Sequence, residues 1–130
     1  IESAEIQVQE FTYHLAKSEQ SFIAQDHSKA NVWRKRGIKD GFIDFRMSSD
    51  FIYNLIRGLS KPYVGAHINF QEKECKVWSA KPCDDVYLNF EPGKVLEINS
   101  HGAIKVVTGS SSIWLLEHEI PTKENIEYLL

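Results

Sequence analysis

The chain has 130 residues, of which 42% are hydrophobic and 25% are charged, and its formal net charge is −3. This length and composition fit one ordinary globular core and exclude a disordered or collagen-like chain. No apolar run approaches the roughly 18 residues of a membrane span, and the first residues lack a signal-peptide pattern, so we expect a cytoplasmic protein. The charge argues against a dedicated nucleic-acid binder, which needs a surplus of Lys and Arg on one face.

The first predicted element is an amphipathic helix over residues 3–16. Its apolar residues Ala4, Val8, Phe11 and Leu15 recur at spacings of three and four, so they share one face that needs a packing partner. Residues 21–33 read as extended or irregular around a polar turn. Within this segment we expect four large apolar side chains to be buried: Phe22, Ile23, Val32 and Trp33.

A turn and a second helix come next. Gly37 and the pair Asp40-Gly41 indicate the turn, since glycine adopts backbone conformations that are costly for other residues. A short strand over residues 42–45 is predicted to follow. Ser48 or Ser49 is a good N-cap for a helix that runs to about Leu59, where the apolar stripe ends: Phe51, Ile52, Leu55, Ile56 and Leu59.

From Gly65 onward the apolar period changes to two, which predicts strands. A hairpin of residues 66–70 and 75–80 precedes three strands at 94–99, 103–108 and 112–117. In this pattern His67 points outward. Five short strands indicate a small open barrel of the OB-like kind. Thr122 is predicted to cap a final helix through Glu127, with Ile126 and Leu129 docked on the barrel.

Three motifs lie in order at the centre of the chain. They are D-G-F-I-D-F at residues 40–45, I-Y-N-L-I-R-G-L at 52–59 and P-Y-V-G-A at 62–66. Together they resemble the junction in folate-dependent formyltransferases, where D-G-x-I-D-W, I-x-N-x-I-R-A-L and P-[WY]-P-G-A join the catalytic domain to a C-terminal domain. Phe45, Gly58 and Val64 depart from that pattern. The likeness continues to about His118, through residues 76–80, 92–96 and 107–109.

The resemblance implies an α+β fold, with a helical N-terminal segment from the end of a catalytic domain followed by a small open OB-like β-barrel. Residues 1–62 would be the tail of the catalytic domain and the linking helix, and residues 63–130 the C-terminal barrel domain. The sequence begins at Ile1 without an initiator methionine, which also predicts a fragment. The resemblance implies 10-formyltetrahydrofolate as the cofactor of the parent enzyme, with none bound by this chain alone.

Formyl transfer needs a base and groups that stabilise an oxyanion. The resembling family supplies an Asn, His and Asp set from its catalytic domain, with the His in an H-P-S-L-L-P-like motif. None of the five histidines here is followed by Pro-Ser: His14, His27, His67, His101 and His118. We therefore expect no catalytic residue in this chain, and we expect the activity to need the missing N-terminal catalytic domain. The scattered histidines and two cysteines predict no metal site.

The same resemblance places six residues at the edge of a substrate or folate cleft: Asp40, Gly41, Asp44, Phe45, Asn54 and Arg57. The alternative is that the two aspartates organise turns and that the arginine pairs with an acid. A basic cluster is either a nucleic-acid contact or a solvated loop: Arg34, Lys35, Arg36 and Lys39. The three tryptophans are stacking platforms for bases or, as we expect, core anchors: Trp33, Trp78 and Trp114.

The acceptor separates two branches of the resembling family. Methionyl-tRNA formyltransferases hold tRNA with a typically basic C-terminal domain, whereas others formylate an amino sugar on a nucleotide carrier. The negative charge, with Lys61-Pro62-Tyr63 and residues 76–79, favours the branch with a small-molecule nucleotide sugar. tRNA is the alternative. A free-standing OB-like binding module, or a homodimer formed through the apolar face of the first helix, stays open.

Overall fold

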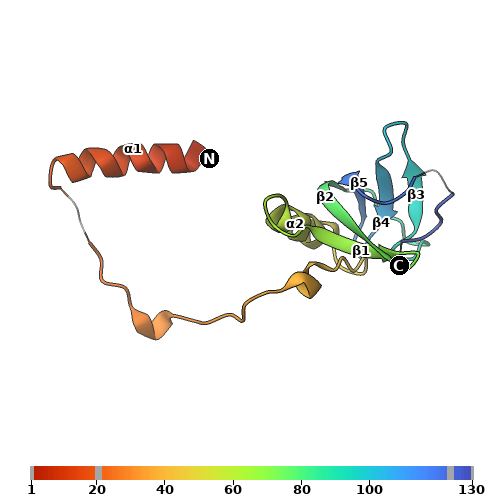
Figure 1. Ribbon diagram of the computed structural model, residues 1–130, viewed down its shortest axis with the longest axis horizontal. Helices are drawn as coiled ribbons and strands as arrows, with labels where there is room; N and C mark the ends of the chain where they lie inside the picture. The colour runs from red at the N-terminus through yellow and green to blue at the C-terminus, as the bar shows by residue number, and fades with distance from the viewer. Residues whose placement is uncertain (1, 20–21, 123–124, 130) are drawn as a thin grey trace. The chain divides into compact units, whose positions relative to one another are not determined.

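The computed structural model describes residues 2–19, 22–122 and 125–129 of the chain (Figure 1). The chain divides into two compact units, Ile1–Arg34 and Lys35–Leu130. The second unit holds a five-stranded sheet and the hydrophobic core. The first holds a helix and an extended segment.

The first unit contains α1 (Glu2–Ala16) and one turn of 3-10 helix, η1 (His27–Lys29). The helix predicted over residues 3–16 is confirmed, although none of its described residues is buried, and its first turn is acidic, where the helix dipole favours negative charge. The burial predicted for the extended segment is wrong. Every described residue of this unit is exposed, including the four large apolar side chains that were expected to be buried: Phe22, Ile23, Val32 and Trp33. One helix and one extended segment provide no second layer to pack against.

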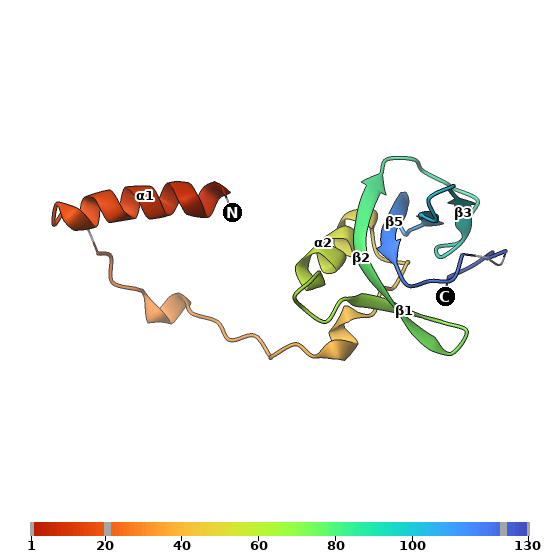
Figure 2. The ribbon, with the colours of Figure 1, turned by 45° about the horizontal axis from the view of Figure 1, so that its top comes forward.

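The second unit is built on antiparallel strands in the order β1-β2-β5-β4-β3. They are β1 (Ala66–Phe70), β2 (Lys73–Cys83), β3 (Val95–Ile98), β4 (Ile104–Val107) and β5 (Ser112–His118). Figure 2 shows the long, curved β2 beside β1 and β5. The strands lie where the two-residue period predicts them, and the α+β fold class is confirmed.

A tight turn joins β1 to β2. Its two residues, Gln71 and Glu72, have φ angles of 51° and 63°. Positive φ at both central positions is what a type I′ hairpin turn requires, because that turn matches the twist of the flanking strands. The resulting register pairs Phe70 with Lys73 and Ala66 with Val77.

Both edges of the sheet are covered by segments that are not strands. At β1, the backbone N–H of Ile43 donates to the carbonyl oxygen of His67 at 2.8 Å. Near β3, the N–H of Leu129 donates to the carbonyl of Gly93 at 2.8 Å, and that of Val95 to the carbonyl of Glu127 at 2.9 Å. These contacts satisfy backbone groups that an open edge strand would expose.

Three local predictions need correction. Residues 42–45 form no strand, and Phe42 makes only an isolated bridge to His67. His67 was predicted to point outward, but it is 6% exposed because the segment around Phe42 folds over it. Residues 125–127 are not helical, while residues 123–124 of the predicted last helix lie outside the described residues. The predicted docking of Ile126 and Leu129 is confirmed, since both are buried in the core.

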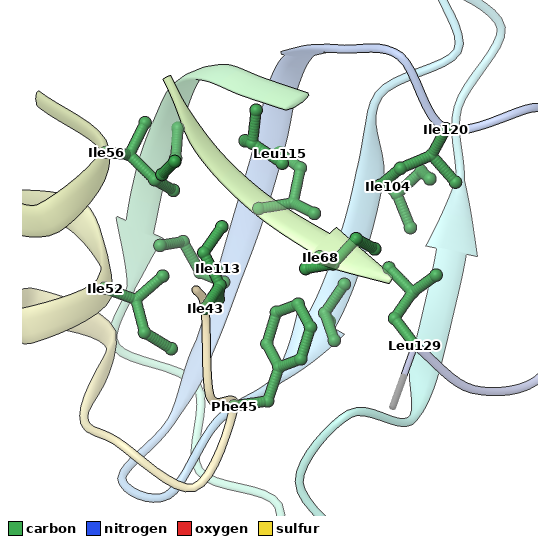
Figure 3. Packing of buried hydrophobic residues seen from close by; sticks show 14 of the residues in the cluster. Ile43, Phe45, Ile52, Ile56, Ile68, Ile104, Ile113, Leu115, Ile120 and Leu129 are labelled. Carbon is green, nitrogen blue, oxygen red and sulfur yellow. The ribbon is translucent and has the colours of Figure 1, made fainter. Parts of the chain in front are cut away.

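α2 (Ser49–Leu59) packs against β2 and follows η2 (Ile38–Gly41), the turn of 3-10 helix that it contacts. The Ser48 hydroxyl accepts a hydrogen bond from the Phe51 N–H at 3.3 Å, which confirms the predicted N-cap. Figure 3 shows Ile52 and Ile56 directed into the buried cluster that includes Leu115 of β5. Phe51 was predicted to share this apolar stripe but is 69% exposed, because it precedes the buried Ile52 on the helix and falls outside the face that meets β2.

Candidate functional site

The candidate site is built on a loop of residues 40–46, here called the junction loop, which lies in the second unit ahead of α2. Asp40 closes its start, because one carboxylate oxygen accepts the Gly37 N–H at 2.7 Å. Asp44 closes its end by accepting the Arg46 N–H at 3.0 Å and the Arg46 guanidinium at 2.6 Å. Hydrogen bonding to Arg46 lowers the pKa of Asp44 to about 2. Both aspartates therefore organise the loop.

Gly41 permits the close approach of the junction loop to the rest of the fold. It is buried, and a Cβ atom at this position would lie 3.0 Å from Cδ1 of Leu59 and 3.2 Å from the carbonyl oxygen of Gly65. Contacts of this length are tighter than ordinary packing allows. Any other residue here would push the loop away from the last turn of α2.

A groove runs along the solvent side of α2, and we call it the α2 groove. Its volume is about 460 Å³. It is lined by nine residues from the loop region and the helix: Arg36, Gly37, Asp40, Met47, Phe51, Asn54, Leu55, Gly58 and Leu59. The structure thus brings together two of the predicted cleft residues, Asp40 and Asn54, with Arg36 of the basic cluster.

The remaining predicted cleft residues lie elsewhere. Asp44 and Phe45 line a second cavity of about 360 Å³, which Arg46 and Glu91 also line. Phe45 is itself a buried part of the core. In the described structure the pair Asp40 and Asn54 therefore lines a different cavity from the pair Asp44 and Phe45, and their joint place at a cleft edge stays a prediction.

Arg57 lies at a third, smaller cavity of about 160 Å³, together with Tyr53, Ser60 and Trp78. Its guanidinium donates to the side-chain oxygen of Asn54 at 3.3 Å and lies 5.7 Å from the centre of the Tyr53 ring. Among the described residues, Arg57 therefore contacts an amide and an aromatic ring. The alternative prediction had been that it pairs with an acidic side chain.

The basic cluster is exposed on the surface. Lys35, Arg36 and Lys39 are all exposed, as is Arg34 in the first unit. Arg36 is the member that reaches the α2 groove. Within the cluster, Arg36 therefore supplies a positive charge to the lining of that groove.

The tryptophans differ in surroundings. Trp33 is 77% exposed and donates to the side-chain oxygen of Asn31 at 3.1 Å. Trp78 is half-buried, with its ring against Gly65 and the Lys61 amine 5.0 Å from its centre. Trp114 is half-buried on β5, opposite Lys81 on β2 and Lys105 on β4. The described structure thus makes none of them a fully buried anchor.

Sequence reasoning missed the pairing of basic residues with acids in the second unit. The pairs are Lys61 with Glu117 at 3.0 Å, Lys76 with Glu74 at 2.7 Å, Lys105 with Asp85 at 2.5 Å, and Arg46 with Asp44 at 2.6 Å. Two of these pairs have partners far apart in sequence, so only the tertiary fold reveals them. The partners in the pairs Asp44-Arg46 and Glu74-Lys76 are only two residues apart, so the sequence alone could have predicted these two pairs.

The His118 ring is held between two backbone groups. His118 Nδ1 accepts the Ile120 N–H at 3.2 Å, so Nε2 donates to the carbonyl of Gly102 at 2.9 Å. Burial lowers the pKa of His118 and raises that of the Cys75 thiol.

Within residues 2–19, 22–122 and 125–129, no cluster of three His, Cys, Asp or Glu side chains is suited to hold a metal ion. In the same residues, no helix has the length and apolar character needed to cross a bilayer.

Comparison with known proteins gives the family. Residues 38–128 match the family model described as formyl transferase, C-terminal domain. The chain is 39% identical over 70 residues to the bifunctional polymyxin resistance protein ArnA of Wigglesworthia glossinidia brevipalpis, covering 54% of this chain and 10% of that protein. It is 30% identical over 100 residues to a methionyl-tRNA formyltransferase of Natranaerobius thermophilus, covering 74% of this chain and 32% of that protein.

The fold is also shared with a solved structure. The crystal structure of a HypX variant from Aquifex aeolicus superposes with a TM-score of 0.60 at 20% identity, over 94% of this chain and 21% of that one. The chain spans at most about a third of each of these proteins. The family match begins at η2 and includes the junction loop, α2 and the whole sheet. The chain therefore belongs to the formyl transferase C-terminal domain family.

Proposed function

We propose that the chain is the C-terminal part of a 10-formyltetrahydrofolate-dependent formyltransferase that N-formylates an amino sugar on a nucleotide carrier. In this proposal the chain is structural or accessory to the acceptor site. The base and the oxyanion-stabilising groups come from the catalytic domain of the parent enzyme. The parent works in the cytoplasm.

The charge distribution of the second unit supports the choice of a nucleotide-linked amino sugar as the acceptor. Lys61, Lys76, Lys105 and Arg46 each have a carboxylate partner within 3.0 Å. A cation that is already paired contributes little to the neutralisation of phosphate, which dominates nucleic-acid affinity. Asp and Glu also outnumber Lys and Arg in the chain, 18 to 15. A small acceptor can be bound without a broad cationic surface.

The domain assignment belongs to the same proposal. Residues 1–62 form the tail of the catalytic domain and the linking helix, and residues 63–130 form the C-terminal domain. The exposed apolar side chains of the first unit support this, because side chains such as Phe11 and Trp33 would be covered by the rest of a catalytic domain. α2 would then be the linking helix between the two domains of the parent.

The test is formyl transfer by the full-length parent protein. With 10-formyltetrahydrofolate as donor, we expect a nucleotide-linked amino sugar to be formylated and methionyl-tRNA to be left unchanged. The matching binding measurement is a tryptophan-fluorescence titration of the 130-residue chain with bulk tRNA at low and near-physiological salt, for which we expect no saturable change. Formylation of methionyl-tRNA, or salt-sensitive saturable tRNA binding, would overturn the choice of acceptor.

A second candidate function is to hold tRNA for a methionyl-tRNA formyltransferase. The exposed basic cluster favours it, since Lys35, Arg36 and Lys39 point a local excess of positive charge to solvent. The match to a methionyl-tRNA formyltransferase over 74% of the chain is consistent with it. The same tRNA titration decides between the two acceptors.

A further inference from the structure

The described residues that follow β5, 119–122 and 125–129, are here called the C-terminal strap, and the end of this strap lies along the β3 edge of the sheet. The Val95 N–H donates to the carbonyl of Glu127 at 2.9 Å, and the Leu129 N–H donates to the carbonyl of Gly93 at 2.8 Å. Three apolar side chains of the strap are buried in the core: Ile120, Ile126 and Leu129. The strap therefore covers the edge and also completes the core.

His118, the last residue of β5, holds the start of the strap. The Ile120 N–H donates to Nδ1 of its ring at 3.2 Å, and Nε2 lies 2.9 Å from the carbonyl oxygen of Gly102, in the turn between β3 and β4. A backbone N–H can only donate and a carbonyl can only accept, so the ring that fits both contacts is neutral with its proton on Nε2. The strap also packs on this turn, because a Cβ atom on Gly102 would lie 3.6 Å from the Thr122 hydroxyl. One ring thus joins β5, the turn and the strap.

A second proton on the His118 ring is incompatible with this arrangement. The imidazolium carries an N–H at both nitrogens, so Nδ1–H would face the N–H of Ile120, and the strap would lose its acceptor. The ring is half-buried, and this burial lowers the pKa of His118 below its ordinary value of 6.5. The closed strap therefore favours the neutral ring, whereas a ring released to water takes up its proton more readily.

The charged and titratable side chains on the elements around His118 make their contacts elsewhere or face solvent. They are Glu117 of β5, Lys76 of β2, Glu119 and Glu127 of the strap, and His101 of the turn. Glu117 binds Lys61 at 3.0 Å, and the Lys76 amine binds Glu74 at 2.7 Å. The Glu119 carboxylate accepts the backbone N–H of Lys76 at 3.2 Å. His101 and Glu127 are exposed, so the printed contacts of the His118 ring are with two backbone groups.

We propose that His118 is a proton-sensitive latch, and that protonation of its ring releases the C-terminal strap from the β3 edge of the sheet. The bond that breaks is the hydrogen bond from the Ile120 N–H to Nδ1, and water then solvates both groups. Release exposes the Val95 N–H and the Gly93 carbonyl, which are backbone groups of the kind that pair with an added strand. The latch goes beyond the proposed function and does not depend on the acceptor.

The test is amide hydrogen exchange of the ¹⁵N-labelled 130-residue chain, followed by NMR at about pH 7.5 and about pH 5.5 and corrected for intrinsic exchange rates. The Val95 and Leu129 amides report the strap, and the Gly109 amide, which donates to the carbonyl of Met47 at 2.9 Å, reports the unit near α2. We expect protection at Val95 and Leu129 to fall severalfold at the lower pH. The limit is about tenfold, because one proton changes the opening equilibrium by at most a factor of ten per pH unit. Protection at Gly109 should stay within about twofold.

Two variants separate the latch from other histidines. His118→Gln removes the titrating ring and keeps a polar side chain, so the strap should open equally at both pH values, whatever its absolute protection. His101→Gln is the matched control, because it removes an exposed histidine from the turn that His118 contacts. In this variant the pH dependence should remain.

The unmodified chain supplies a measurement that needs no variant. The ring ¹⁵N shifts of His118 should show an unprotonated Nδ1 at about pH 7.5. The titration midpoint of the ring should lie below 6.5 in the folded chain, and the loss of strap protection should level off near that midpoint. A ring whose proton lies on Nδ1 at the higher pH would reject the latch.

The outcomes of the exchange experiment are distinct. A fall in protection that is confined to the strap and disappears only in His118→Gln supports the latch. An equal fall at Gly109 would show that acid loosens the whole unit, and the proposal would be overturned. Unchanged protection at Val95 and Leu129, or a pH dependence that persists in His118→Gln, would overturn it as well. Loss of the pH dependence in His101→Gln would assign the proton to the turn instead.

Discussion

At the scale of single residues, Gly109 allows the turn between β4 and β5 to lie against the segment before α2. Its N–H donates to the carbonyl of Met47 at 2.9 Å, and a Cβ atom on it would lie 2.0 Å from the carbonyl oxygen of Arg46. We expect Gly109→Ala to lower the free energy of unfolding by about 3 kcal/mol or more, since backbone must move to relieve the overlap. Urea unfolding followed by circular dichroism measures this.

Gly58→Ala is the matched control for that substitution. Gly58 lies within α2 and has open space where a Cβ atom would stand. Alanine is favoured over glycine in a helix by roughly 1 kcal/mol, so this variant should be more stable than the unmodified chain. Equal loss of stability in both alanine variants would contradict the steric account of Gly109.

The Asp44-Arg46 pair makes a pH-dependent contribution. The folded-state pKa of Asp44 is about 2, below its ordinary value of 3.8, chiefly because of its hydrogen bonds to Arg46. A lowered pKa means that this stabilisation is present above pH 3.8 and is lost as the pH falls toward 2. We expect the urea midpoint to fall less steeply between pH 4 and pH 2 in Asp44→Asn than in the unmodified chain. Arg46→Gln should flatten the profile in the same way, and a profile unchanged in both would reject the assignment.

At the scale of elements, the docking of α2 on the sheet depends on its buried isoleucines. Ile56 is 1% exposed, whereas Phe51 on the same helix is 69% exposed. We expect Ile56→Ala to destabilise the unit by about 2–5 kcal/mol through lost burial and the cavity that remains. Phe51→Ala should change the stability by less than about 0.5 kcal/mol. Comparable losses in the two variants, measured by urea unfolding, would show that the helix packs by a different face.

The sequence predicted those elements whose signals are local. The strand period, the Ser48 cap and the glycine turns all act within a few residues, so five strands and α2 were found with nearly correct limits. The errors come from long-range contacts. His67 alternates as a solvent-facing residue should, but the junction loop covers it, and Phe42 takes part in a bridge instead of a strand. Likewise the α2 groove joins Arg36 to Gly58, a proximity that no spacing rule predicts.

At the scale of the whole molecule, the two units differ in how many apolar side chains they bury. The buried apolar cluster lies entirely between Ile43 and Leu129, with α2 on one side of the sheet and covered strand edges. The described residues before Lys35 contribute no buried side chain. Independent folding requires a core of its own, and among the described residues such a core lies in the second unit.

We therefore expect residues 35–130 to fold cooperatively when residues 1–34 are removed. The urea midpoint and the denaturant slope should match those of the unfolding transition of the second unit in the full chain, because the slope follows the surface exposed on unfolding. The dispersed amide signals of the five strands should also keep their positions in NMR spectra. A truncated chain that unfolds non-cooperatively would show that residues 1–34 complete the fold. A truncated chain with an unchanged midpoint would show that α1 and the extended segment add nothing to the stability of the second unit, in keeping with their exposed apolar side chains.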